Sequence, residues 1–372
     1  MDAEVLVVGA GPVGSALTLM LRALGVRTML VDRATFPRDK ACGEGLMPGG
    51  VRLLAEVGVD LAGLGFPRID GVRYRLPHRG WVSAAFSGPA FGVRRVRFDA
   101  VLAELAGAEG PTAVSTISPR RDSVVVETDR GRLRCATLVA ADGMRSPIRR
   151  AMGWEQDGPA CDRYGMVGHL EAPRHGRSEI EVTLLEGVET YLAPAGPDEL
   201  LVAVLGARSR LHAEGTTTKE LYRRLVDDAH PELAAARLNG GLRGAGPFGI
   251  RARRVAGARV FLCGDAAGFI DPLTGEAMSS GIEQADFLAR QLARDPHGAA
   301  PAYARYFAAQ WRRRRLMTGL ARAMTGSPRA AQRALRGISR HPQTLERMLQ
   351  IADGSRGLSA LRPADGAALA GW

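Results

Sequence analysis

The feature that most constrains the fold is a glycine-rich stretch near the start of the chain. Four apolar residues that favour β-structure, Val5–Val8, lead directly into Gly9-Ala10-Gly11-Pro12-Val13-Gly14, a G-x-G-x-x-G pattern. An apolar segment, Ser15–Leu21, and a second apolar run, Thr28–Val31, come next, and the second run ends on Asp32. This order predicts a strand, a tight turn, a helix and another strand, which together form a βαβ unit.

Each glycine of this pattern has its own physical role. Gly9 permits the turn, Gly11 lets the backbone approach a pyrophosphate, and Gly14 lets the helix pack close to the strand. The helix N-terminus presents unpaired N–H groups and a partial positive charge to the phosphates, and Asp32 would accept hydrogen bonds from ribose hydroxyls. A glycine-rich turn in another α/β protein is the alternative, but the flanking strand, helix and acid favour a dinucleotide site.

The composition is that of a globular enzyme with a basic surface. The chain has 372 residues, of which 46% are apolar and 24% charged, and this length allows two or three domains. The net charge is +11, and nearly all basic residues are arginines, a bias that also fits a GC-rich coding sequence. Such a charge favours an acidic partner or an anionic cofactor. No helix-turn-helix, zinc finger or aromatic–basic RNA motif is present, so no nucleic-acid partner is expected.

The cysteines and histidines indicate neither a metal site nor an obvious base. None of the cysteines has C-x-x-C spacing or a nearby histidine cluster: Cys42, Cys135, Cys161 and Cys263. Three histidines lack an acidic partner nearby in sequence and are expected to be satisfied or surface residues: His78, His169 and His212. No signal peptide precedes the first strand, and no apolar run reaches about 18 residues. We therefore expect a cytoplasmic protein with reduced thiols and no stable membrane insertion.

The rest of the chain predicts further α/β elements and one long loop. The loop, Arg33–Pro48, is rich in Pro and Gly, and a loop of this kind after the second strand of a nucleotide fold is more often functional than accidental. Helices are expected over 49–57, 94–105, 218–229 (capped by Thr218) and 281–292, and helical, arginine-rich sequence over 301–350. Strands are expected over 72–76, 81–86, 124–128, 133–136, 137–141, 178–185, 190–193, 200–205 and 259–263. The alternation over 178–185 predicts one wet and one dry face.

Three separated pieces resemble one known family. Asp142-Gly143 and Gly264-Asp265 each end a predicted buried strand, and they follow Gly9–Gly14 in the chain. In this order the pieces resemble the flavoprotein monooxygenase superfamily with the p-hydroxybenzoate-hydroxylase-like FAD fold, over roughly the first 300 residues. The stretch Arg38–Leu46 is most similar to geranylgeranyl reductases and to hydroxylases of bacterial natural-product pathways. The W-x-W-x-I-P signature of flavin-dependent halogenases is absent between Ser178 and Gly206.

The resemblance implies an α/β architecture in three parts. A Rossmann-like FAD-binding domain would comprise residues 1–70, 95–160 and 245–300. An inserted substrate domain with a mixed or antiparallel β-sheet would comprise residues 71–94 and 161–244. A C-terminal helical region with a mobile tail would comprise residues 301–372, with the tail over 354–372.

The resemblance also implies site residues along the cofactor. The turn from Gly9 to Gly14, with Pro12 and Val13, would hold the FAD pyrophosphate, while Asp32 would bind the adenosine ribose and Arg33 would lie along the adenine. Arg95, in an R-x-x-F-D pattern, would contact the FAD chain, and Asp265 after Gly264 would accept from the ribityl hydroxyls. Asp142 and Gly143 would lie near the pyrophosphate, shared in some relatives with the nicotinamide cofactor. A simple turn role for Asp142 and a helix cap for Asp265 remain alternatives.

Two further segments would lie near the flavin ring. The resemblance implies that Arg38, Cys42 and Gly43 line the cofactor site, with Cys42 facing the substrate, although a buried structural cysteine is an equal alternative. The segment Pro272, Gly275, Glu276, Ala277 and Met278 would pass the ring, with the following helix N-terminus aimed at its N1/C2=O edge. Relatives often have a second glycine at the position of Ala277.

The single G-x-G-x-x-G shapes the expected reaction. It leaves no second Rossmann domain for a nicotinamide cofactor, so NAD(P)H would bind transiently on the FAD domain, or a separate protein would donate electrons. The first option fits an FAD-dependent monooxygenase, a hydroxylase or epoxidase that acts through a flavin C4a-hydroperoxide on a hydrophobic aromatic or isoprenoid natural-product intermediate. The alternative is a reductase of isoprenoid double bonds similar to geranylgeranyl reductases. A simple nucleotide-binding module is disfavoured by the Arg38–Leu46 loop.

Overall fold

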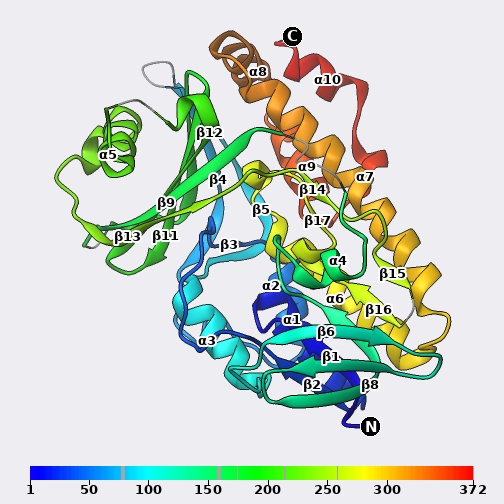
Figure 1. The fold of residues 1–372 in the computed structure, drawn as a ribbon. Coiled ribbons are helices and arrows are strands. Elements are labelled where there is room, and N and C mark those ends of the chain that lie inside the picture. Colours follow the sequence, from blue (N-terminus) through cyan, green and yellow to red (C-terminus); the bar gives the residue numbers. More distant parts are fainter. Residues whose placement is uncertain (77–79, 157–160, 174, 213–214, 258, 372) are drawn as a thin grey trace.

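Two large β-sheets and a set of long helices form the molecule. The computed structural model describes the whole chain except residues 77–79, 157–160, 174, 213–214, 258 and 372 (Figure 1). His78, and with it part of the turn between two predicted strands, lies outside the described residues. Among the described residues, no helix combines the length and the apolar character needed to cross a membrane.

The first sheet contains the predicted βαβ unit. Its strands follow the order β15 (Ala256–Gly257), β16 (Val260–Leu262), β8 (Gly131–Ala140), β1 (Ala3–Val8) and β2 (Thr28–Val31). Central β1 runs parallel to both neighbours, with Val5 opposite Thr28 on one side and Thr137 on the other. Helix α1 (Pro12–Ala23) connects β1 to β2, as predicted. Two further strands extend β8 in antiparallel fashion: β7 (Val124–Thr128) and β6 (Val114–Pro119).

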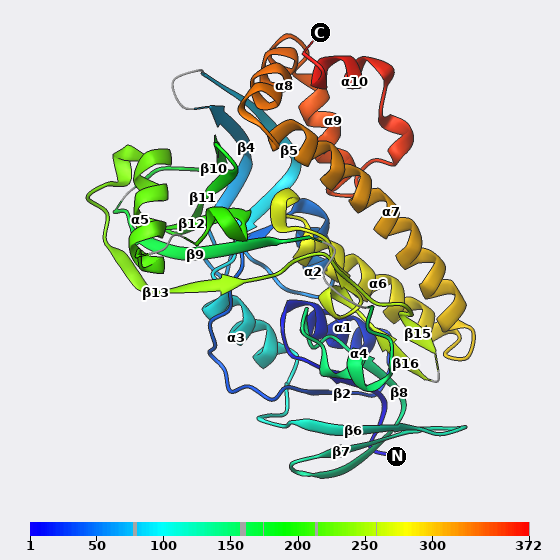
Figure 2. The ribbon, with the colours of Figure 1, turned by 45° about the horizontal axis from the view of Figure 1, so that its top comes forward.

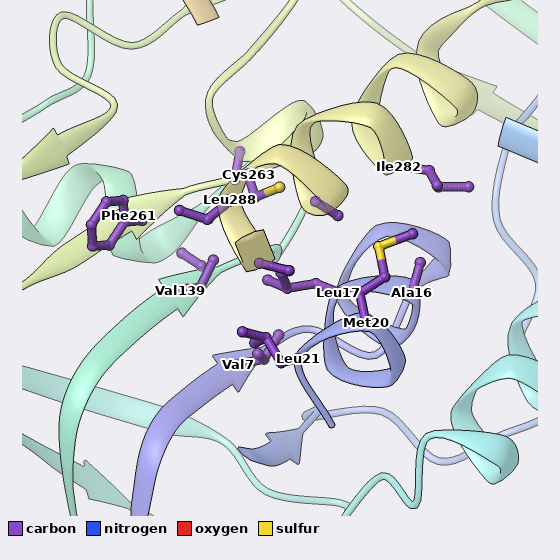
Figure 3. Close-up of a cluster of buried hydrophobic side chains, with 14 of the residues drawn as sticks. Val7, Ala16, Leu17, Met20, Leu21, Val139, Phe261, Cys263, Ile282 and Leu288 are labelled. Atoms are coloured by element: carbon purple, nitrogen blue, oxygen red, sulfur yellow. The ribbon is translucent and has the colours of Figure 1, made fainter. Parts of the chain in front are cut away.

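Three helices cover one face of this sheet. Helix α1 lies between α3 (Arg95–Leu105) and α6 (Ala277–Arg294) (Figure 2). Figure 3 shows Leu17 and Leu21 of α1 meeting Val7 of β1 and Leu288 of α6, and all four side chains are buried. Burying each such side chain stabilises the fold by roughly 1.5–3 kcal/mol. The contact is close because Gly281 of α6 faces Val13, and a Cβ at Gly281 would lie only 2.5 Å from Val13 Cγ2.

The second sheet is mixed and lies beside the first. Its strand order is β13 (Leu238–Ala245), β9 (Arg163–Glu171), β12 (Glu199–Ala207), β11 (Val188–Gly196), β10 (Glu179–Leu185), β4 (Arg68–Leu76), β5 (Gly80–Gly92) and β3 (Gly45–Leu46). Within the described part of this sheet, β10 and β4 are the one parallel pair. Helix α5 (Thr218–Ala229) packs near β12 and β10.

The second sheet corrects one prediction about β10. The sequence alternation predicted a wet face, yet Glu181 and Thr183 are buried along with Val182 and Leu184. Glu181 tolerates burial because Arg75 Nε lies 3.0 Å from its Oε1. Both faces of β10 are therefore covered, and sequence alternation alone does not reveal a charged residue that is neutralised by a distant partner.

The C-terminal helices run from the first sheet to the second. The long helix α7 (Ala299–Thr325) spans this distance (Figure 2), and α8 (Pro328–Arg340) and α9 (Gln343–Ala352) pack against the second sheet. The segment expected to be mobile instead contains α10 (Pro363–Leu369), which packs on α8. Asp365 anchors it, because its carboxylate accepts hydrogen bonds from Thr344 Oγ1 at 2.8 Å and from Arg347. The composition of residues 354–372 alone did not predict these contacts of α10.

Helices α2 (Pro48–Glu56) and α4 (Pro147–Ala151) and the short pair β14 (Ile250–Arg251) and β17 (Gly268–Phe269) complete the main elements. Of these remaining elements, α2 lies where a helix was predicted, whereas α4, β14 and β17 were not predicted. The strands predicted over 133–136 and 137–141 are one strand, β8, because pairing with β7 and with β1 is continuous along it. Helix α5 is capped by Thr217 rather than Thr218, in a reciprocal pair with Glu220. The division of the chain into the three domain ranges given above stays a prediction.

Candidate functional site

Four parallel strands bring the predicted motifs to one edge of the first sheet. Gly9 follows β1, Asp32 follows β2, Asp142 follows β8, and Gly264-Asp265 lies just beyond β16. The carboxyl ends of parallel strands share one edge, which is where open α/β sheets bind ligands. The structure thus assembles a single site from four segments that are far apart in the sequence.

Backbone contacts hold the glycine-rich turn. Gly9 has a φ of +106°, and a Cβ there would lie 2.5 Å from the Ala141 carbonyl oxygen. A Cβ at Gly14 would lie 1.8 Å from the Gly9 carbonyl oxygen, which explains the close approach of α1 to β1. At Gly11 a Cβ would approach only the ends of Arg38 and Arg95, at 3.5 and 4.0 Å. The Gly11 backbone is therefore open toward two guanidinium groups.

The positive groups beside Gly11 share one buried carboxylate. Arg95 donates to both Asp99 oxygens at 2.6 and 2.7 Å, and Arg38 Nη1 lies 3.1 Å from Asp99 Oδ2. Burial opposes the charge of Arg95, but Asp99 outweighs this effect and raises the pKa of Arg95. Desolvation by the surrounding protein, and then the positive charge of Arg95, lower the pKa of the Lys40 ammonium group. Arg38 and Arg95 thus present guanidinium groups beside Gly11, and such groups suit a pyrophosphate.

The three strand-end aspartates keep hydrogen-bonding capacity. Asp32 accepts from Ala10 N at 2.7 Å and from Ala34 N at 2.8 Å, one bond to each oxygen. Asp142 Oδ2 accepts from Ile148 N at 3.3 Å, whereas its Oδ1 is buried without a partner in the described part of the chain. Burial raises the pKa of Asp142. A hydroxyl-rich ligand would satisfy these free acceptor positions.

Asp265 is the third of these aspartates, and its carboxylate has the fewest hydrogen bonds. Its carboxylate accepts no hydrogen bond from the described residues. The N-cap position of the short turn Gly264–Ala266 is occupied by Cys263 and not by Asp265. The helix-cap alternative therefore has no support in the described hydrogen bonds. Burial raises the pKa of Asp265, and the charges of Lys40 and Arg314 oppose part of that shift.

The segment expected at the flavin ring is held from both sides. Asp271 Oδ1 accepts from Leu273 N at 3.0 Å, and Asp271 Oδ2 lies 2.9 Å from Arg163 Nε of β9. Tyr191 of β11 donates its hydroxyl to the Leu273 carbonyl at 3.1 Å. Gly275 has a φ of +66° and an unobstructed Cβ direction, and α6 begins two residues later at Ala277, followed by Met278. The N-terminus of α6 thus lies at the loop, as the resemblance implied.

An apolar cavity lies between this loop, the second sheet and the C-terminal helices. Its empty space of about 490 Å³ includes space that is open to solvent. Its walls come from β4, β5, β10, β11, the loop and α9: Met47, Val72, Tyr74, Phe86, Ile180, Val182, Tyr191, Leu273–Glu276, Leu349, Ala352 and Asp353. A second cavity shares Tyr74 and Leu349 with the first and continues along α7 and α9.

This cavity partly matches the sequence prediction. The middle sheet forms one wall, as expected, but the opposite wall is built by α7 and α9, which sequence reasoning had not assigned to the site. Cys42 is not among the residues that line the two cavities; its Sγ accepts from Glu44 N at 3.3 Å. Burial raises the pKa of the Cys42 thiol, and Arg95 opposes that shift. Its substrate-facing role stays a prediction.

Sequence reasoning missed a buried pair that joins the long loop to the second sheet. His169 Nε2 lies 2.9 Å from Glu44 Oε2, and Glu44 Oε1 accepts from Arg95 N at 2.9 Å. His169 is thus a satisfied histidine, as expected, while His212 is exposed. The 125-residue separation of the pair left no local signal. Arg33 and Gly43 are exposed at the ends of the same loop.

One further group of side chains could in principle hold a metal ion. Ligand atoms of Glu181, His230 and Glu232 lie within 4.8 Å of one another. However, Arg75 pairs with Glu181, and Arg177 pairs with both carboxylates. These arginines already supply the positive charge that a cation would bring, so we assign no metal to this group.

Comparison with known proteins identifies the family. Residues 2–64 and 101–318 match the family described as an FAD binding domain. The chain belongs to this family. It is 30% identical over 309 residues to menaquinone reductase of Mycolicibacterium smegmatis, and the alignment covers 76% of this chain and 74% of the relative. It is also 29% identical over 325 residues to digeranylgeranylglycerophospholipid reductase 1 of Methanopyrus kandleri, with 76% and 78% covered.

Monooxygenases and halogenase-like enzymes also occur among the similar proteins. The chain is 28% identical over 324 residues to rifampicin monooxygenase of Streptomyces venezuelae, covering 80% of this chain and 65% of the relative. A flavoprotein/dehydrogenase from Cytophaga hutchinsonii has a TM-score of 0.83 at 19% identity, covering 95% and 93%. The flavin-dependent brominase Bmp2 has a TM-score of 0.83 at 18% identity, covering 99% and 97%. At these identities the two structures establish the FAD-binding fold alone.

Family membership makes the protein an FAD-dependent oxidoreductase, and its residues fit that cofactor. Arg38 and Arg95 beside Gly11 suit the pyrophosphate, and the open oxygens of Asp142 and Asp265 suit hydroxyl groups. The N-terminus of α6 suits the electron-rich edge of the ring. When bound, FAD supplies redox chemistry that no side chain provides. The individual contacts of these residues with FAD stay predictions.

Proposed function

We propose that this flavoprotein takes electrons from NAD(P)H and reduces a carbon–carbon double bond of a long hydrophobic isoprenoid substrate. The observation that carries the proposal is the pair of adjoining apolar cavities, one at the Leu273–Glu276 loop and one between α7 and α9. Its methionine-rich far wall, Met317, Met324 and Met348, suits a flexible apolar chain. Two groups of relatives are named for the reduction of menaquinone and of a digeranylgeranyl lipid, both of which carry polyprenyl chains.

Oxygen insertion into a hydrophobic aromatic or isoprenoid substrate is the second candidate. Relatives named rifampicin monooxygenase and squalene monooxygenase support it. The apolar cavity also suits a reaction that requires water to be kept away from the reacting atoms. The two candidates use the same cofactor and cavity, and they differ in what the substrate gains.

The mass of the product separates the two candidates. The protein with bound FAD is incubated with NAD(P)H and a polyprenyl lipid that has no quinone ring, because reduction of such a ring would itself add two hydrogens. The incubation is run with and without oxygen. We expect a gain of two hydrogens that persists without oxygen. A gain of one oxygen that requires air would instead establish the monooxygenase and refute the reductase. Protein stripped of FAD serves as the control for reduction by NAD(P)H alone.

A further inference from the structure

A single carboxyl group lies at the flavin-loop end of the apolar cavity. Glu276 follows Gly275 and immediately precedes α6, and it is among the residues that line the cavity. It is only 4% exposed, and its Oε2 has no hydrogen-bond partner in the described part of the chain. Its other oxygen accepts from Thr274 Oγ1 at 3.1 Å. Burying a carboxyl group whose second oxygen makes no hydrogen bond costs free energy unless the group is neutral. A group that is kept in such a state points to a function.

The surroundings of Glu276 suit a group that exchanges a proton. Arg314 of α7 is 3% exposed, and its Nε lies 3.6 Å from Glu276 Oε1. Burial raises the pKa of Glu276, while Arg314 and then Arg313 oppose part of the shift and Glu283 adds to it. Burial thus favours the protonated form and Arg314 favours the carboxylate, so Arg314 would stabilise the charge that remains after the proton has left.

Other polar groups of the cavity are less suited to this role. Asp353 accepts from Ser87 Oγ at 2.8 Å and from Ser355 N at 2.9 Å, so both of its carboxylate oxygens already have donors. Burial raises the pKa of Tyr74 to about 12, which makes it a weak acid. Tyr191 already donates its hydroxyl to Leu273. Among the described residues that line the cavity, Glu276 is the carboxyl group best placed to donate.

We propose that Glu276 is the proton donor to the substrate double bond, with Arg314 as its positioning residue. The proposal rests on the reductase function proposed above. The π bond breaks, one carbon receives a hydride from the reduced flavin, and the other carbon receives the proton of the Glu276 carboxyl group. Glu276 is left as a carboxylate beside Arg314 and recovers its proton from water. Electrons and protons balance, because the substrate gains one hydride and one proton.

The first test measures the protonation of Glu276 without any turnover. Infrared spectra of the FAD-free protein are recorded as the pH rises, for the wild type, Glu276→Gln and Glu283→Gln. Glu283 is a matched control because it lies on α6, burial also raises its pKa, and it pairs with Arg313 outside the cavities described. We expect the wild type to show a carbonyl band of a protonated carboxylic acid that is absent in Glu276→Gln and present in Glu283→Gln, separate from the bands of the other buried acids whose pKa is raised. A wild type without that band would overturn the proposal.

The second test separates the two halves of the reaction. In Glu276→Gln, NAD(P)H should reduce the flavin as fast as in the wild type, while reoxidation by the polyprenyl substrate should slow by about 10²–10⁴-fold, the usual contribution of a general acid. Glu283→Gln should remain within about threefold of the wild type, well below that general-acid range. Equal reoxidation in Glu276→Gln would overturn the role of Glu276 while leaving the reductase intact. A wild-type product that gains oxygen would instead refute the reductase function and the donor role with it.

Discussion

The two ends of the site are built by different means. At the pyrophosphate end, backbone meets backbone: Gly14 approaches the Gly9 carbonyl so closely that no side chain fits between them. At the substrate end, side chains from the second sheet, the Leu273–Glu276 loop, α7 and α9 converge on an apolar space. The glycine-rich turn at the first end depends on a few consecutive residues, whereas the apolar space at the second end depends on segments that meet only in the folded protein.

This difference bears on what each end tolerates. A backbone contact has no rotamers through which it can adjust, so a small change there disturbs the whole turn. An apolar wall of flexible side chains can repack, so changes there alter which substrate fits before they alter stability. We therefore expect mutations to cause loss of cofactor at one end and altered turnover at the other.

The largest effect is expected from Gly14→Ala. A Cβ at this position would lie 1.8 Å from the Gly9 carbonyl oxygen, so the turn must open or α1 must move away. We expect little folded, FAD-containing protein, measured by flavin absorbance and thermal unfolding. The control is Gly319→Ala in α7, where nothing lies within 4 Å and a gain of about 0.5–1 kcal/mol in stability is expected. Normal FAD content in Gly14→Ala would show that the turn can adjust.

A smaller effect is expected when a side chain of the cofactor end is removed. Asp265→Ala should weaken FAD binding by about ten- to a hundredfold, because a buried, charge-assisted hydrogen bond contributes roughly 1.5–3 kcal/mol. FAD affinity is measured by titration of the FAD-free protein, with the exposed Asp122→Ala as control. An unchanged affinity would mean that Asp265 does not contact the cofactor.

Coupling between the two ends should appear in the kinetics. Under the proposed function, one site would serve both nicotinamide and substrate, so substrate binding should shift the flavin toward its reducible position. We expect reduction by NAD(P)H to be at least about tenfold faster with substrate, a difference of roughly 1.4 kcal/mol. Stopped-flow bleaching of the flavin band measures this. Fast reduction without substrate would exclude such gating, and reduction only by dithionite or a ferredoxin would indicate a separate protein donor.

The smallest effect concerns the wall behind the substrate cavity. Burial alone raises the pKa of Asp365, but the hydrogen bonds from Arg347, the Arg362 N–H and Thr344 outweigh it and lower the pKa to about 2. The carboxylate therefore stabilises the fold above its unfolded pKa near 4, and this contribution is lost as the pH falls toward 2. We expect Asp365→Asn to lose about 1–2 kcal/mol at neutral pH and to unfold with a weaker pH dependence between pH 4 and 2. Equal acid unfolding curves for the wild type and Asp365→Asn would show that the Asp365 carboxylate of α10 contributes nothing to stability.

Sequence reasoning predicted the cofactor end far better than the substrate end. The βαβ unit, the strand ends at Asp142 and Asp265 and the start of α6 all depend on residues close together in the chain, whose periodicity and glycine positions are visible locally. The pairs Glu44–His169 and Glu276–Arg314, and the wall formed by α9, depend on contacts between distant segments. Hydrophobic periodicity shows that a face is buried, but not what covers it. The ordered α10 was missed for the same reason.

The order of strands in the first sheet has a consequence for synthesis of the chain. Strand β1 pairs with β8, and β16 completes that side of the sheet only after a further 120 residues, counted from Ala140 to Val260. At a ribosomal rate of about 5–20 residues per second, β16 follows β1 by roughly 13–50 s. From the time β8 pairs with β1 until β16 is made, Leu138–Ala140 of β8 expose an unpaired strand edge, which invites aggregation. A nascent chain would thus depend on chaperones until β16 and α6 have left the ribosome, and FAD would join it as a late, stabilising step.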